Sequence, residues 1–105
     1  MSSLIENIKE LLIFYVKTNY ENYLEQNNIK KIKDEDVAGI VKSIYESRKQ
    51  HSKDFVKSSL KQILKDDEYP GDSQIDLLLR DIYEDEILLL KKLENQIIEY
   101  QNSKV

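Results

Sequence analysis

The sequence contains no cysteine, one histidine, two glycines and one proline among its 105 residues. Without cysteine, the chain cannot form disulfides, thiolate nucleophiles or cysteine-ligated metal sites. It also lacks a Gly-rich phosphate loop and a G-x-S-x-G nucleophile motif. The composition therefore predicts that the protein is not an enzyme and has no catalytic residues, no metal site and no cofactor.

Long hydrophobic runs are absent as well. The longest apolar stretch covers residues 11–16, far fewer than the roughly 20 residues that cross a bilayer as a helix. The first residues show no basic segment followed by an apolar stretch, so no secretory signal is expected. Together with the lack of cysteine, these absences predict a cytoplasmic location, with the nucleus as an alternative, and no membrane span.

What the sequence does contain is apolar residues at every third or fourth position, the spacing of an amphipathic helix. This pattern is longest from Ser73 to Gln101, a stretch without glycine or proline. At ~1.5 Å per residue a helix of this length extends roughly 43 Å, so the helices that pack against it must also be long. The apolar stripe of this helix consists of Ile75, Leu78, Leu79, Ile82, Leu89, Leu90, Leu93, Ile97 and Tyr100.

The whole pattern predicts a single all-α domain over residues 1–105. Turn-forming residues, Asn27–Asn28 and Pro70–Gly71, separate the periodic stretches. Short connections of this kind favour an up-down-up antiparallel bundle of three long helices. The predicted helices cover about 3–27, 35–66 and 72–101.

The middle of the second helix is polar, because residues 46–54 contain no strongly apolar side chain. The helix is therefore either continuous, with or without a kink, or broken near 50–52. Glu86 interrupts the apolar stripe of the last helix, and a hairpin centred between Tyr69 and Pro70 places it opposite this polar stretch. We expect a polar layer there, which costs stability but fixes the register of the helices; alternatively, the layer is open and receives a side chain of a partner. The candidate partners of Glu86 in this layer are Arg48, His51 and Lys53.

The net charge of −4 is unevenly distributed: residues 1–28 carry −2, residues 29–65 carry +5 and residues 66–105 carry −7. The simplest interpretation is a basic second helix beside an acidic last helix, since opposite charges on neighbouring helices attract each other. Lysine recurs at every fourth position of the second helix. This lysine ridge consists of Lys49, Lys53, Lys57, Lys61 and Lys65.

The lysine ridge permits two interpretations. It is either a solvated face that the acidic helix partly neutralises, or a surface that binds an anionic partner such as an acidic protein tail, RNA or membrane headgroups. Arginine is scarce and aromatic residues do not alternate with the lysines. Both features argue against base-specific recognition, so a nucleic acid is not the expected partner.

A second candidate surface lies on the reverse side of the last helix, where a lone bundle has no need for apolar residues. The residues predicted to form this partner interface are Leu77, Ile87, Leu88 and Ile98. Exposed apolar ridges of this kind usually mark contacts with other helices. We therefore expect a helical protein–protein interaction module, an adaptor or an assembly subunit of a larger complex. Its partner would be another protein, in the simplest case a second copy of the chain, and binding of an anionic partner through the lysine ridge is the alternative function.

Overall fold

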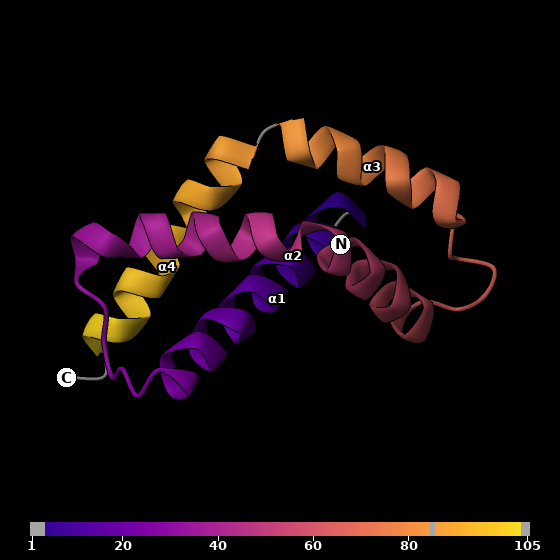
Figure 1. The fold of residues 1–105 in the computed structure, drawn as a ribbon. Coiled ribbons are helices and arrows are strands. Elements are labelled where there is room, and N and C mark those ends of the chain that lie inside the picture. Colours follow the sequence, from indigo (N-terminus) through magenta and orange to yellow (C-terminus); the bar gives the residue numbers. More distant parts are fainter. Residues whose placement is uncertain (1–3, 85, 104–105) are drawn as a thin grey trace.

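The computed structural model describes residues 4–84 and 86–103, and Glu86 in its backbone only. This part of the chain contains four α-helices and no strand (Figure 1). The helices are α1 (Leu4–Gln26), α2 (Asp34–Ile63), α3 (Asp72–Glu84) and α4 (Glu86–Ser103). The predicted all-α class is confirmed, whereas the prediction of three helices is wrong for the last one.

The predicted helix 72–101 is divided into α3 and α4 around residue 85, which lies outside the described residues. Figure 1 shows that the two helices run in different directions: α3 follows the C-terminal part of α2, and α4 crosses its N-terminal part. Since α2 itself bends between these parts, one straight helix could not pack against both. The division allows α3 and α4 to pack against different parts of α2.

The structure also decides between the two alternatives for the second helix. α2 is continuous from Asp34 to Ile63, so a break near 50–52 is excluded. Figure 1 shows that it bends in its middle. Three carboxylates in the first turn, those of Asp34, Glu35 and Asp36, interact favourably with the positive end of the helix dipole.

Two residues with positive φ shape the connections between helices. Asn28 has a φ of 55°, and the Ile29 amide beside it donates to the Leu24 carbonyl at 2.8 Å. This arrangement ends α1 with a left-handed residue, as helices commonly do. Gly71 has a φ of 103° and directly precedes α3. The end of α1 at Asn27–Asn28 agrees with the prediction, whereas the turn after α2 lies at residues 66–68 instead of Pro70–Gly71, with the Glu68 and Tyr69 amides donating to the Lys65 carbonyl.

One hydrophobic core joins the four helices. Tyr20 of α1 and Tyr45 of α2 are among the largest side chains that are fully buried. Burial of each large apolar side chain contributes ~1.5–3 kcal/mol, so this core is the main source of stability. Of the predicted stripe, the members that are buried are Ile75, Leu79, Ile82, Leu89, Leu93 and Ile97. The members that are only half-buried are Leu78, Leu90 and Tyr100.

Candidate interaction surfaces

Two apolar side chains at the start of α4 are largely exposed: Ile87 by 81% and Leu88 by 71%. A groove lies on each side of Leu88, and we call Ile87, Leu88 and these two grooves the α4 surface. The first groove, of about 370 Å³, is lined by Ala38, Lys42, Ile87, Leu88, Leu90, Lys91 and Glu94. The second, of about 460 Å³, is lined by Ile5, Glu6, Lys9, Ile13, Leu78, Asp81, Ile82, Leu88, Leu89 and Lys92.

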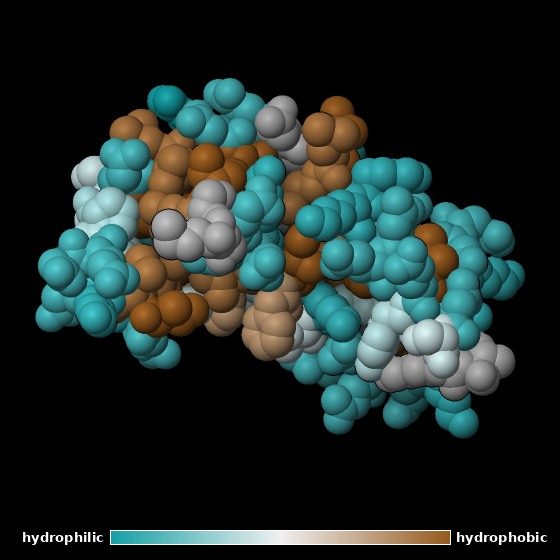
Figure 2. All heavy atoms as spheres, turned by 180° about the vertical axis from the view of Figure 1, so that it is seen from behind, coloured by the Kyte–Doolittle hydropathy of each residue, from teal (hydrophilic) through white to brown (hydrophobic). Residues whose placement is uncertain are grey.

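The back of the molecule carries a group of hydrophobic side chains (Figure 2). Figure 2 shows hydrophobic side chains over the half of this face where α3 and the start of α1 lie. The second groove takes its apolar residues from the same helices and from α4. The sequence did not single out its α1 residue Ile5, which is 42% exposed. The exposure of Ile5 depends on how far α3 and α4 cover the start of α1.

The structure brings together only part of the predicted partner interface. Ile87 and Leu88 are adjacent and exposed, and Leu77 is 47% exposed but belongs to α3. Ile98 is half-buried and packs against the core. Because α3 and α4 are separate helices, these residues do not form the straight ridge that a continuous helix 72–101 would present.

Exposed apolar side chains are also found away from α4. Phe14 of α1 is 60% exposed, and its ring stacks on that of Phe55 in α2 with 6.3 Å between the centroids. Tyr15 packs against the same Phe55 ring at 5.1 Å. Phe14 does not belong to the buried face of α1, which consists of Ile8, Leu12, Val16 and Tyr20. The exposed ring is therefore anchored by an intramolecular aromatic contact.

Ion pairs connect the lysine ridge to α3. Lys57 pairs with Asp76, and Lys61 lies 3.2 Å from a carboxylate oxygen of Asp72. The hydrogen bond with Asp76 raises the pKa of Lys57. Hydrogen bonds from the Tyr69 hydroxyl and from Lys61 lower the pKa of Asp72. These contacts agree with the interpretation that the acidic helix neutralises part of the ridge.

Two further ridge lysines lie over an aromatic ring. The ammonium nitrogens of Lys49 and Lys53 are 5.0 Å and 5.3 Å from the centroid of the Tyr83 ring. Cation–π contacts of this length are favourable by ~0.5–1 kcal/mol at exposed sites. Of the predicted ridge, Lys65 near the end of α2 is exposed. Four of the five ridge lysines therefore contact residues of α3 or of the turn before it.

The centre of the predicted polar stretch is occupied by Ser52, which is 1% exposed. Its hydroxyl donates to the Lys49 carbonyl at 2.7 Å and lies 3.0 Å from the Tyr83 hydroxyl. Since the one serine proton is used, the tyrosine is the donor in the second bond. Ser52 was not predicted to be buried, although its position seven residues after Tyr45 and four before Val56 continues the buried stripe of α2.

The residues predicted for the polar layer are not those of the Ser52–Tyr83 pair. Arg48 and His51 are exposed, so neither belongs to a buried layer, and Lys53 lies over Tyr83. The side chain of Glu86 lies outside the described residues. The pairs Ser52–Tyr83 and Lys57–Asp76 put the centre of the α2–α3 hairpin near residue 67, two to three residues before the predicted centre.

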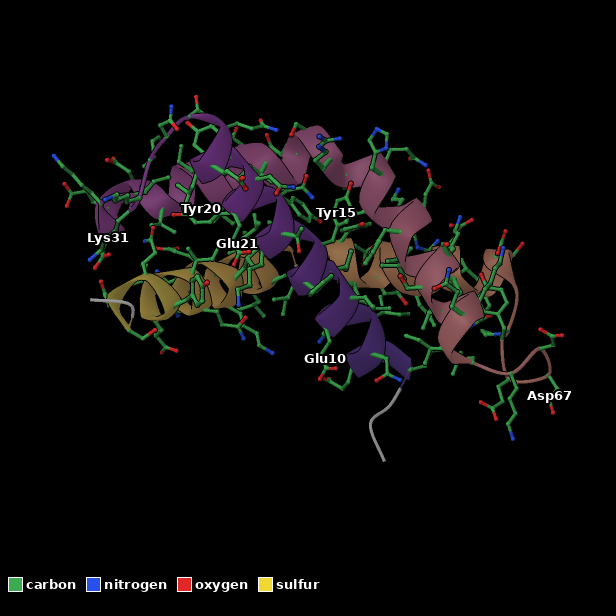
Figure 3. All side chains as sticks on the ribbon, turned by 90° about the horizontal axis from the view of Figure 1, so that it is seen from below. Glu10, Tyr15, Tyr20, Glu21, Lys31 and Asp67 are labelled. Atoms are coloured by element: carbon green, nitrogen blue, oxygen red, sulfur yellow. The ribbon has the colours of Figure 1, made fainter. Side chains whose placement is uncertain are left out.

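A second buried polar group closes the other end of the bundle. Gln101 is 5% exposed, and its side-chain oxygen accepts from the Tyr20 hydroxyl at 2.7 Å and from the Ile32 amide at 3.0 Å. Its amide donates to the Ile32 carbonyl at 3.2 Å. Figure 3 shows Tyr20 near the C-terminal end of α1, beside α4. Burial raises the pKa of Tyr20 to about 12.

No protein family model matches this chain, and no match is found among curated proteins or solved structures. Within residues 4–84 and 86–103, no three histidine, aspartate or glutamate side chains are grouped in a way that could hold a metal ion. The helices in this part of the chain are too short or too polar to cross a membrane. The candidate surfaces for binding a partner are the α4 surface and the lysine ridge.

Proposed function

We propose that the chain is a non-enzymatic helical interaction module, an adaptor or an assembly subunit, and that it binds a helix of another protein through the α4 surface. The observation that supports this proposal is the exposure of Ile87 and Leu88 between two grooves. A single exposed leucine is ordinary on a protein surface. Two adjacent exposed apolar side chains, such as Ile87 and Leu88, beside apolar grooves form the kind of patch that marks an interface.

A partner helix laid across Leu88 would fill the grooves with side chains spaced three and four residues apart. Burial of each large apolar side chain would contribute ~1.5–3 kcal/mol before the entropic cost of association. Charged side chains of both signs surround the apolar residues, among them Lys42 and Glu94 beside the first groove. An apolar centre with a polar rim is typical of protein–protein interfaces.

The test compares the wild-type chain with a double variant, I87S and L88S. Sedimentation velocity first shows whether the pure chain forms dimers, and quantitative mass spectrometry of proteins bound to the immobilised chain then identifies other partners. We expect specific partners to be lost in the double variant, and thermal unfolding to be nearly unchanged because both side chains are exposed.

L77S is the matched control, because Leu77 is an exposed apolar residue that lines neither groove. Partner binding that survives in I87S/L88S, or that is lost equally in L77S, would reject the α4 surface as the interface. Loss of folding in the double variant would instead make these residues part of the core.

Binding of an anionic partner through the lysine ridge is a second proposal. The contacts of Lys57 and Lys61 with Asp76 and Asp72 reduce the charge available on the ridge as a whole. The observation that favours the proposal is more local: a basic groove of about 530 Å³ between α2 and α3.

A further inference from the structure

The groove between α2 and α3 differs in charge from the rest of the molecule. Four cationic and two anionic side chains line it, which gives it a formal net charge of +2, whereas the whole chain carries −4. Its volume lies within the roughly 300–1,000 Å³ range of small-molecule sites. The residues that line it are Lys49, Gln50, Lys53, Lys57, Asp76, Arg80, Tyr83 and Glu84.

Contacts across the groove show which residues lie at the same level. Ser52 bonds to Tyr83, and Lys57 pairs with Asp76. Arg80 lies between Asp76 and Tyr83 on α3, and the midpoint between Ser52 and Lys57 on α2 falls at residues 54–55. Lys53 lines the groove from α2 close to this level, and Arg80 lines it from α3.

Cationic side chains outnumber carboxylates in the groove, although Asp76 and Glu84 lie about one turn before and after Arg80 on α3. Arg80 lies 3.7 Å from Asp81, but Asp81 lines the groove on the other side of α3. This ion pair joins two largely exposed side chains, and such pairs are weak in water. Lys49 adds a third cation nearby, because its ammonium lies over the same Tyr83 ring as that of Lys53.

We propose that this groove binds a phosphoryl group between Lys53 and Arg80, with Lys49 as a further contact. The dianion would balance the groove's formal charge of +2. A guanidinium donates two parallel hydrogen bonds to phosphate oxygens, and an ammonium acts as a compact charge beside them. A small phosphorylated compound and a phosphorylated side chain present the same group. This inference does not depend on the proposed interaction through the α4 surface.

The site can be tested by calorimetry and by ¹⁵N–¹H NMR titration of the full chain at low salt. The two probes are inorganic phosphate and a short peptide that contains one phosphoserine. We expect saturable binding that shifts resonances of α2 and α3 around the groove. K53Q and R80Q should each weaken binding roughly tenfold, the usual effect of losing one charged hydrogen bond.

The matched control is K92Q, which removes the same charge on α4, outside the groove. Its affinity should stay close to that of the wild type, and circular dichroism should show that all three variants are folded. Binding of phosphate and peptide would support a site for free phosphorylated compounds, and binding of the peptide alone would support a protein-borne phosphoryl group. No saturable binding of either probe, or an equal loss in K92Q, would overturn the proposal.

Discussion

Gln101 holds three parts of the chain together. Its side chain bonds to Tyr20 in α1 and to both backbone groups of Ile32 in the α1–α2 connection. All of these groups are buried. An unsatisfied buried polar group costs about 1–3 kcal/mol, which makes this polar cluster more important for stability than its small size suggests.

The first prediction concerns this residue. Q101A should lower the free energy of unfolding by about 1–3 kcal/mol, because it leaves buried groups of Tyr20 and Ile32 without partners. Urea unfolding followed by circular dichroism measures the loss. Q96A, which truncates an exposed glutamine of the same helix, is the control, and equal stability of the two variants would contradict the structural role of Gln101.

A pH prediction follows from Tyr20. Burial raises its pKa from the ordinary value of 10.0 to about 12, so the folded state favours the protonated phenol more than the unfolded state does. The contribution of protonated Tyr20 to the free energy of unfolding is therefore fully present below pH 10. It is lost as the pH rises from 10 to about 12.

Y20F removes this titration, while Tyr69 and Tyr83, whose pKa values are also raised, still titrate. The wild type should accordingly lose more stability than Y20F between pH 10 and 12, as thermal unfolding in a pH series can measure. Parallel curves for the two proteins would show that Tyr20 makes no contribution.

At the scale of the helices, the periodic stripe correctly predicted most of the buried side chains of the last helical stretch. It did not predict that this stretch changes direction. Ile75, Leu79, Leu93 and Ile97 follow one helical period across the division between α3 and α4, and all are buried. The periodicity records which residues face the core. It carries no information about the bend of α2 or about the change of direction between α3 and α4 (Figure 1).

Two leucines of α4 allow a core position to be compared with a surface position. L93A should lower the free energy of unfolding by ~2–5 kcal/mol, because Leu93 is 1% exposed and its removal leaves a cavity. L88A should change it by no more than about 0.5 kcal/mol, because Leu88 is 71% exposed. Chemical unfolding of both variants provides the measurement. Similar losses would mean that the α4 surface is part of the core.

At the scale of the whole molecule, the sequence predicted the sign of the charges better than their pairing. The basic and acidic segments were visible in the order of residues, and contacts such as Lys57–Asp76 now join them. Which lysine meets which carboxylate depends on the register across the connection between α2 and α3. That register is set by where α2 ends, at Ile63, and the sequence placed this end at residue 66.

The candidate surfaces were predictable to a similar degree. Ile87 and Leu88 stood out because they fall outside the apolar stripe, and both are exposed. The basic groove was not predictable, since it is lined by Lys53 from α2 and by Arg80 from α3. Ser52 and Gln101 were missed because polar residues were not counted as core, although both lie at buried positions of their helices.

The cluster around Gln101 also constrains the order in which the protein folds. Gln101 is 81 residues from Tyr20 and 69 from Ile32 along the chain, and closing such long loops is entropically costly. On the ribosome, α1 and α2 are made first, and a hairpin of these two helices can form before α4 exists. The bonds of the Tyr20 hydroxyl and the Ile32 amide with Gln101 cannot form until Gln101 has been synthesised. This polar cluster can therefore form only after contacts between α1 and α2 are possible.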